Sequence, residues 1–254
     1  MPTAPPRPGT PPGSPDNPHN PHNLGNPDNP DNDVLWTRGL HRAHAGSPAL
    51  RDLSLAVREG EILAVTGGRG SGRTTLLDCL SGRLPPDRGE VWFNSIPLHA
   101  LRSPALARLR RERFGWIGDR AQLVPELTAR ENAALPLLLA GAGARAARRT
   151  AQQWLERLDV GHCAHLRPGA LDRAQRQRVA VARALVHRPA VLFADEPTAP
   201  LHGQERRVVL RTLVTAARSH AITMLLACND PQAVELADRG LTLCDGRLAC
   251  SLTA

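Results

Sequence analysis

EILAVTGGRGSGRTTLL, which spans Glu61 to Leu77, predicts a strand, a glycine-rich turn and the first turns of a helix. Residues 62–65 form a short apolar run that suits a buried strand, and the leucines after Thr74 follow a helical pattern. Four of the six residues in 67–72 are glycine. Glycine adopts the positive φ angles that a tight turn needs, and it leaves backbone N–H groups free to face an anion. A helix beginning at such a turn adds its positive dipole end, so this stretch predicts a phosphate-binding loop.

The loop fits the motif G-x-x-x-x-G-K-[ST] at Gly67, Gly72 and Thr74, whereas Arg73 occupies the lysine position. The structural alternative is a glycine-rich connection between a strand and a helix that binds nothing. The residues predicted to bind a nucleotide here are Gly67, Gly68, Arg69, Gly70, Ser71, Gly72, Arg73, Thr74 and Thr75.

The composition favours a single domain, or one core with a subdomain, because 254 residues with 41% hydrophobic content can bury a sizeable core. The formal charge of +8 depends on arginine alone, since the sequence contains no lysine. A net positive charge can favour binding to nucleic acid or to an anionic membrane surface. The arginines, however, are spread over several predicted helices, and aromatic residues make up only 3% of the chain. We therefore expect solvated helix faces and no nucleic-acid partner.

The cysteines and the apolar segments indicate neither a metal-binding protein nor a membrane-spanning one. The five cysteines form no CxxC pair and no repeated metal spacing, so they are expected to be reduced. The N-terminus lacks the apolar stretch of a secretory signal. The longest apolar segment, 133–144, is short and contains Pro136, Gly141 and Gly143. The chain is thus not expected to span a membrane, although a peripheral role at one stays open.

The chain divides into a low-complexity tail and a folded part. Residues 1–33 contain eleven prolines and repeated Asn-Pro-Asp or Asn-Pro-His units, and their apolar content is too low for folding. From residue 34 onward short strands surround the phosphate loop, a mostly helical region follows, and strands then alternate with helices. Such alternation implies an α/β fold with a covered parallel sheet. Near the end of the chain the pattern predicts a helix over 231–238, a strand over 241–244 and a hairpin turn at Asp245-Gly246.

A second motif, AVLFADEPT at 190–198, places two adjacent carboxylates at the end of a strongly apolar strand. Ligands bind at the carboxyl ends of the strands in a parallel sheet, so this motif is expected close to the phosphate loop. Asp195 can hold Mg²⁺ together with the Thr74 hydroxyl, and Glu196 can orient or deprotonate an attacking water. The structural alternative is a turn in which Asp195 only caps a loop.

At this point the sequence resembles the ATP-binding-cassette (ABC) ATPases. The resemblance rests on QRQRVAVARALVHRPAVLFADEPTA, Gln175 to Ala199, and covers residues 34–250. LTARENAALPLLLAG, at 127–141, further resembles the branch that serves lipoprotein-release and macrolide-export transporters. The resemblance implies a P-loop NTPase fold with a parallel-sheet core, an N-terminal antiparallel β subdomain and an α-helical subdomain inserted at about 119–186, in one ATP-binding domain over 34–254. It also implies ATP and Mg²⁺ bound between two such domains, with the phosphate loop of one facing the signature motif of the other.

Several positions depart from the motifs of this family. They are Arg73 in the phosphate loop, Asp119 in the glutamine loop, Asp172, Arg173, Ala174 and Gln175 in the signature, His202 after Leu201, Asn229 after Cys228, and His44 at the adenine-stacking position. Asp119 can still offer Mg²⁺ an oxygen, and Asn229 can form a hydrogen bond but cannot become a cation. Asp172 puts a carboxylate where a hydroxyl should meet the γ-phosphate, but it is also a good helix N-cap with Gln175 three residues on.

Two functions fit these residues. In the first, the chain is the nucleotide-binding subunit of an ABC transporter, peripheral at the inner, cytoplasmic face of the membrane. It then drives a separate multi-span permease as a homodimer or a heterodimer. In the second, the altered motifs leave a degenerate pseudo-ATPase that regulates or supports an intact subunit. Since Glu196 is retained while five motifs are altered, we expect ATP binding to be more robust than hydrolysis. A third interpretation, a non-transport ABC protein that acts on nucleic acid or ribosomes, fits the basic charge but usually involves two cassettes in one chain or long insertions, and only one cassette is present.

Overall fold

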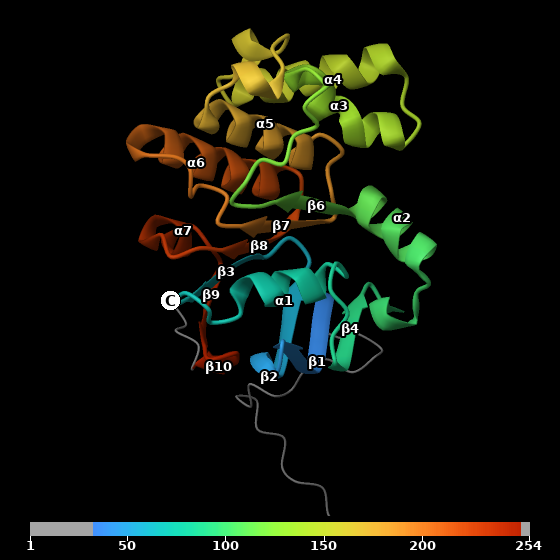
Figure 1. The fold of residues 1–254 in the computed structure, drawn as a ribbon, viewed down its shortest axis with the longest axis vertical. Helices are drawn as coiled ribbons and strands as arrows, with labels where there is room; N and C mark the ends of the chain where they lie inside the picture. Colours follow the sequence, from blue (N-terminus) through green and yellow to red (C-terminus); the bar gives the residue numbers. More distant parts are fainter. Residues whose placement is uncertain (1–32, 250–254) are drawn as a thin grey trace, which may run out of the picture.

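The computed structural model describes residues 33–249, which fold into two β-sheets and a set of covering helices (Figure 1). The predicted tail, residues 1–33, lies outside this range apart from Asp33. An antiparallel sheet has the strand order β2-β1-β4-β5 and contains β1 (Asp33–His44), β2 (Ser47–Arg58), β4 (Arg88–Phe93) and β5 (Ile96–Pro97). A second sheet has the order β10-β9-β3-β8-β7-β6 and contains β3 (Ile62–Gly67), β6 (Phe114–Ile117), β7 (Val191–Asp195), β8 (Thr223–Ala227), β9 (Arg239–Cys244) and β10 (Arg247–Ala249).

Seven α-helices connect the strands within the described range. They are α1 (Arg73–Leu80), α2 (Ser103–Arg113), α3 (Ala129–Leu139), α4 (Ala144–Arg157), α5 (Arg173–Leu185), α6 (Gly203–Ser219) and α7 (Pro231–Glu235). Short 3-10 helices lie at Leu98–Ala100, Gly161–Cys163 and Pro168–Ala170. Of the helices in residues 33–249, none is long and apolar enough to cross a membrane.

The second sheet is buried on both faces because its central strands are apolar at almost every position. Along β7, Val191 and Phe193 belong to one apolar cluster, whereas Leu192 and Ala194 belong to another. The first cluster also takes in α1 and the antiparallel sheet, and the second takes in α3 to α6. The layers therefore run from the antiparallel sheet through α1 and the second sheet to the helices (Figure 1). This arrangement confirms the predicted α/β fold with a parallel core, an antiparallel N-terminal sheet and a helical part.

Parallel pairing brings three predicted functional segments to one edge of the second sheet. Val65 in β3 pairs with Ala227 in β8, and Ala227 pairs with Asp195 in β7. The phosphate loop, the two carboxylates and Cys228-Asn229 lie at these three strand ends or directly after them. The register of the sheet therefore positions the candidate site.

The last hairpin of the described chain braces the phosphate loop. Its turn lies at Asp245-Gly246, as predicted, because β9 and β10 pair antiparallel on either side. The Gly246 N–H donates to the Ser71 carbonyl at 3.1 Å, and the Arg51 N–H donates to the Gly246 carbonyl at 2.8 Å. Gly246 has a φ of 75°, and a Cβ there would lie 2.6 Å from the Ala49 carbonyl oxygen. Only glycine fits this turn, so the loop is held between β2 and the hairpin.

The prediction of a helix over 231–238 and a strand over 241–244 was wrong in its boundaries. Helix α7 ends at Glu235, and β9 begins at Arg239. The reason is Asp238, whose N–H donates to the Ile62 carbonyl and whose carboxylate accepts from the Ile62 N–H, both at 2.9 Å. These bonds to β3 hold Asp238 in a bend before β9, which a helix through this position would not permit.

Asn132 ties the segment after β6 to α3, and its replacement provides a test of the helical layer. The side chain is fully buried, accepts from the Val124 N–H at 2.8 Å and donates to the Val124 and Leu127 carbonyls at 3.0 Å. Asn132→Ala is expected to lower the free energy of unfolding by about 3 kcal/mol, since several buried backbone groups lose their partner. Urea denaturation measures this change. A loss below about 1 kcal/mol would show that these groups find other partners.

Candidate functional site

The phosphate loop has the shape of an anion cradle. Gly67 has a φ of 148° and Gly72 a φ of 103°, and a Cβ at either would collide with a backbone carbonyl, of Leu243 or Ala49 respectively. Helix α1 starts directly after Gly72, with no side-chain cap and no acidic residue in its first turn. The first N–H groups of a helix need acceptors from outside it. The loop and the start of α1 therefore offer backbone donors and a positive dipole end that fit a phosphate group.

Thr74 and Asp195 join the loop to the end of β7. Thr74 is exposed in the first turn of α1, and its hydroxyl donates a hydrogen bond to the Asp195 carboxylate. Burial raises the pKa of Asp195 above its ordinary value, while the bond from Thr74 acts in the opposite direction. A hydroxyl and a carboxylate in contact are oxygen ligands of the kind that Mg²⁺ prefers. The residues present therefore fit the metal that the sequence predicts.

Glu196 points toward the same loop from a constrained backbone. Its N–H donates to the Ala227 carbonyl at 2.8 Å, and its carbonyl accepts from the Ala199 N–H at 3.0 Å. Its φ of 47° lies in the left-handed region, which is uncommon for a residue other than glycine. The carboxylate Oε1 lies 2.9 Å from Nη1 of Arg73. This ion pair, which was not predicted from the sequence, joins the residue at the lysine position of the loop to the predicted hydrolytic carboxylate.

Asn229 anchors the start of the phosphate loop. Its Oδ1 accepts from the Gly67 N–H at 3.2 Å. The neighbouring Cys228 is buried, and burial raises the pKa of its thiol to about 11. The thiol is therefore neutral at physiological pH. In this arrangement Asn229 acts on the loop backbone as an acceptor.

Asp119 approaches the site through a connection held by Gln177. Asp119 is exposed two residues after the end of β6, and its charge makes the smallest contribution to the raised pKa of Asp195, after burial, Thr74, Glu196 and Arg73. Gln177 is 1% exposed and donates to the Gly118 carbonyl at 2.7 Å and to the Pro197 carbonyl at 2.8 Å. It thus links the segment before Asp119 to the one after Glu196. Gln177 was not among the site residues predicted from the sequence, although it lies one helical repeat before buried Val181.

The signature residues lie apart from the phosphate loop of the same chain. Helix α5 packs on the face of the second sheet opposite α1 (Figure 1). Asp172 accepts from the Gln175 N–H at 2.7 Å, and the Gln175 side chain accepts from the Asp172 N–H at 3.0 Å. The predicted N-cap role of Asp172 is confirmed by this capping box. Arg173 is exposed and Ala174 partly buried, so this turn of α5 faces outward.

His44, at the predicted adenine-stacking position, lies beside α1. It is exposed at the end of β1, and its Nε2 is 3.1 Å from Oγ1 of Thr75. This contact places the imidazole at the first turn of the helix that follows the phosphate loop.

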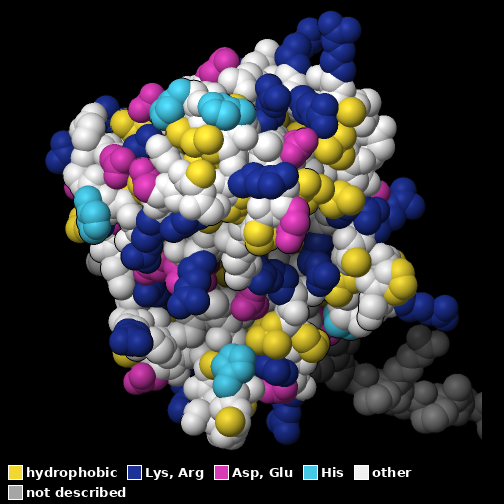
Figure 2. All heavy atoms as spheres, turned by 45° about the horizontal axis from the view of Figure 1, so that its top comes forward, with side chains coloured by type: hydrophobic (Ala, Val, Ile, Leu, Met, Phe, Trp, Pro, Cys, Tyr) yellow, Lys and Arg dark blue, Asp and Glu magenta, His cyan; other side chains and the backbone are white. Residues whose placement is uncertain are grey.

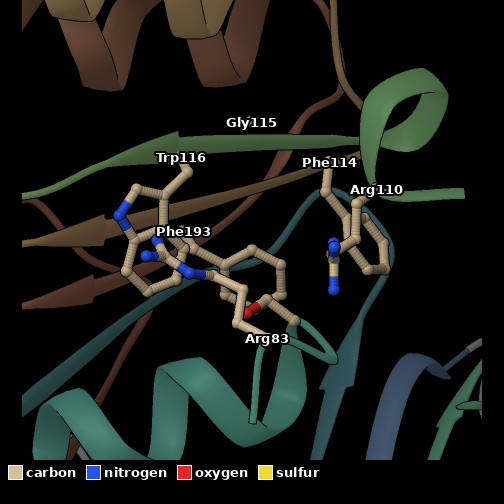
Figure 3. Close-up of a pocket in the computed structure, with 7 residues that line it drawn as sticks. Arg83, Arg110, Phe114, Gly115, Trp116 and Phe193 are labelled. Carbon is tan, nitrogen blue, oxygen red and sulfur yellow. The ribbon is translucent and has the colours of Figure 1, made fainter. Parts of the chain in front are cut away.

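A separate pocket lies at the opposite end of α1. It has a volume of about 330 Å³ and is lined by Ser81, Arg83, Arg110, Phe114, Gly115, Trp116 and Phe193 (Figure 3). The Arg83 guanidinium stacks 3.9 Å over the Trp116 ring. Since α1 separates this pocket from the phosphate loop, the pocket is distinct from the candidate nucleotide site.

The surface over the helical layer carries arginines that are dispersed. Figure 2 shows them interspersed with acidic and apolar side chains on this face, without one continuous basic patch. Pairs such as Arg148 with Glu131, 3.2 Å apart, neutralise part of the charge. This face therefore agrees with the expectation of solvated helices.

Comparison of the chain with known protein families gives a clear match. The model of the ABC transporter family matches residues 50–199, more than half of the 254 residues. The chain belongs to the ABC transporter family. This confirms the family to which the sequence showed a resemblance.

The individual proteins to which this ABC protein is similar are also ATP-binding subunits or cassettes. The lipoprotein-releasing system ATP-binding protein LolD of Koribacter versatilis is 38% identical over 205 residues, covering 80% of this chain and 92% of that protein. The post-hydrolysis dimer of the ATP-binding cassette MJ0796, bound to ADP and Pi, has a TM-score of 0.82 at 26% identity and covers 86% of this chain and 98% of that one. The cassette cbiO1 from Clostridium perfringens, part of the transporter complex cbiONQ, has a TM-score of 0.76 at 25% identity and covers 87% and 88%. These relatives give no support to the pseudo-ATPase alternative.

Proposed function

We propose that this ABC subunit binds ATP with Mg²⁺ at the phosphate loop and hydrolyses it to drive a separate membrane permease from the cytoplasmic face. The observation that carries the proposal is the hydrogen bond from Thr74 to Asp195 beside the uncapped start of α1. It joins an anion cradle to a pair of metal ligands. A glycine-rich connection that binds nothing would require neither the uncapped start of α1 nor the exposed hydroxyl of Thr74.

The residues of this chain have separable roles in the proposed reaction. Backbone N–H groups of the loop hold the phosphates, and Arg73 supplies positive charge. Thr74 and Asp195 hold Mg²⁺, with Asp119 as a further oxygen ligand, and the metal, when bound, neutralises charge on the phosphates. Glu196 accepts a proton from the attacking water, whose oxygen bonds to the γ-phosphorus as the bond to ADP breaks. The products are ADP and inorganic phosphate.

We propose that two cassettes act together, because the signature residues lie far from the phosphate loop of their own chain. Asp172, Arg173, Ala174 and Gln175 would then meet the nucleotide held by a second subunit. The dimeric state of the similar cassette MJ0796 supports this pairing. The similarity to LolD supports a partner from the lipoprotein-release class of transporters. The second cassette is a further copy of this chain or a homologous one.

Binding of a fluorescent ATP analogue to the purified protein, with Mg²⁺ or with EDTA, tests the proposal. The affinity is expected to be higher with Mg²⁺. Thr74→Val removes the hydroxyl at nearly constant volume and is expected to abolish this difference, whereas Thr74→Ser keeps the hydroxyl and should preserve it. If the unmodified protein shows no saturable binding under either condition, the proposed function is wrong.

Asp172 offers a further prediction about pairing. Asp172→Asn retains an N-cap side chain and removes the charge. It is expected to favour the ATP-bound dimer by about tenfold, because the carboxylate no longer repels the γ-phosphate of the partner's nucleotide. Sedimentation of the Glu196→Gln background, in which ATP is retained, measures the change.

The control for this experiment is Asp172→Ala, which removes both the charge and the cap. It is expected to favour the dimer similarly but to lower the free energy of unfolding by about 1 kcal/mol. If Asp172→Asn left the dimerisation constant unchanged in the Glu196→Gln background, the charge of Asp172 would have no repulsive role.

A further inference from the structure

The ion pair between Arg73 and Glu196 occupies the two groups that the proposed reaction needs most. The side chains are 13% and 33% exposed, so solvent screens their attraction only in part. Nη1 of Arg73 lies 2.9 Å from the carboxylate, yet it is buried and its alignment gives no hydrogen bond to any described acceptor. The guanidinium is therefore held by charge, and one buried donor group is left without an acceptor. Such a group is costly unless a further acceptor can reach it.

The two members of the pair differ in how firmly they are held. The backbone of Glu196 is fixed on both sides, by Ala227 and by Ala199, in a left-handed conformation. Arg73 begins α1, and its long side chain has several rotatable bonds between the helix and the guanidinium. A change of partner is therefore a movement of Arg73, with little displacement of Glu196.

We propose that Arg73 is a positioning residue that holds the Glu196 carboxylate in the nucleotide-free chain and releases it when the guanidinium turns to bound phosphate. The proposal rests on the proposed function, since it needs a nucleotide at the loop. Arg73 thus keeps the hydrolytic group engaged until a polyphosphate is in place, which couples nucleotide binding to the freeing of Glu196.

Arginine suits this exchange better than the lysine of the usual motif. Its planar guanidinium presents several N–H groups in fixed directions, whereas an ammonium is a compact point charge on a shorter reach. The same guanidinium can approach a carboxylate on one side and a phosphate on the other. The departure at position 73 therefore changes how the loop is linked to β7, in addition to how it binds phosphate.

A double-mutant cycle tests the exchange with Arg73→Met, Glu196→Gln and both together. The probe is a fluorescent, non-hydrolysable ATP analogue with Mg²⁺, so turnover plays no part. Glu196→Gln removes repulsion toward the phosphates in either background, but it frees a guanidinium only where Arg73 is present. We expect it to tighten binding about fivefold more in the Arg73 background than in the Arg73→Met background. Equal tightening in the two backgrounds would overturn the proposal.

A second readout needs no nucleotide. Each single variant is expected to lower the urea midpoint, and the double variant should lower it by less than the sum, because the pair is already broken. Additive shifts would show that the ion pair does not form in solution. Within the described range Arg69, exposed in the same loop, makes no ion pair with Glu196, so an Arg69→Met cycle should be additive in both assays.

The possible failures are distinguishable. If none of the four proteins binds the analogue, the proposed function and the exchange are both wrong, whatever the urea cycle gives. If all bind and the affinity cycle is additive, the proposed function stands and the positioning role of Arg73 is wrong.

Discussion

Replacing Gly72 with alanine is expected to lower the free energy of unfolding by about 3 kcal/mol and to weaken nucleotide binding by more than about tenfold. Gly72 has a φ of 103°, and a Cβ there would collide with the Ala49 carbonyl and lie 3.1 Å from a Leu50 methyl group. The backbone of β2 would have to move, and with it the loop that precedes α1. Urea denaturation and titration with the fluorescent ATP analogue measure the two effects.

Gly70→Ala is the matched control in the same loop. Gly70 also has a positive φ, of 80°, but nothing lies within 4 Å of a Cβ placed there. The control should therefore carry only the conformational cost, about 1 kcal/mol, which separates backbone strain from collision. If Gly72→Ala proved no more damaging than Gly70→Ala, the contact between the loop and β2 would be looser than the structure indicates.

Glu196→Gln is expected to lower the steady-state rate of ATP hydrolysis by about 100-fold or more, because an amide cannot accept the proton of the attacking water. Glutamine keeps the size of the side chain, and the backbone bonds to Ala227 and Ala199 do not involve the carboxylate. Phosphate release from the purified subunit, alone and with its membrane partner, measures the rate.

Glu59→Gln changes the same charge in an exposed turn before β3, at the opposite end of that strand from the phosphate loop. Its rate is expected to equal that of the unmodified protein. A rate for the unmodified protein no higher than that of Glu196→Gln would mean that this subunit binds ATP without turning it over. That outcome would revive the pseudo-ATPase alternative.

Local signals explain how much of the fold was predictable. Residues 62–80 combine an apolar run, a cluster of glycines and a helical repeat, and each of these depends only on near neighbours. The same holds for 190–196, where an apolar strand ends in two carboxylates. Because parallel strands expose their carboxyl ends at one edge, the closeness of these two segments also followed from the sequence.

The remaining features depend on distances that no local pattern encodes. The end of α7 depends on Asp238 bonding to Ile62, which lies far away in the sequence. Gln177 was not predicted because a polar side chain gives no local signal of burial, although helical periodicity places it on the buried face with Val181. The ion pair of Arg73 with Glu196 requires the register of β3, β8 and β7 together with the turn after β7. Each of these is a property of the assembled sheet.

The bracing of the phosphate loop by Gly246 has a consequence for the order of folding. The phosphate loop is synthesised early, but the elements that support it include both β2, which precedes it, and the β9–β10 hairpin, which is synthesised much later. Contacts between distant segments close large loops, and they form late because that closure costs entropy. We therefore expect the nucleotide site to mature only once almost the whole cassette has left the ribosome. A nascent chain that stops before β9 would carry the complete glycine motif and still lack a rigid site.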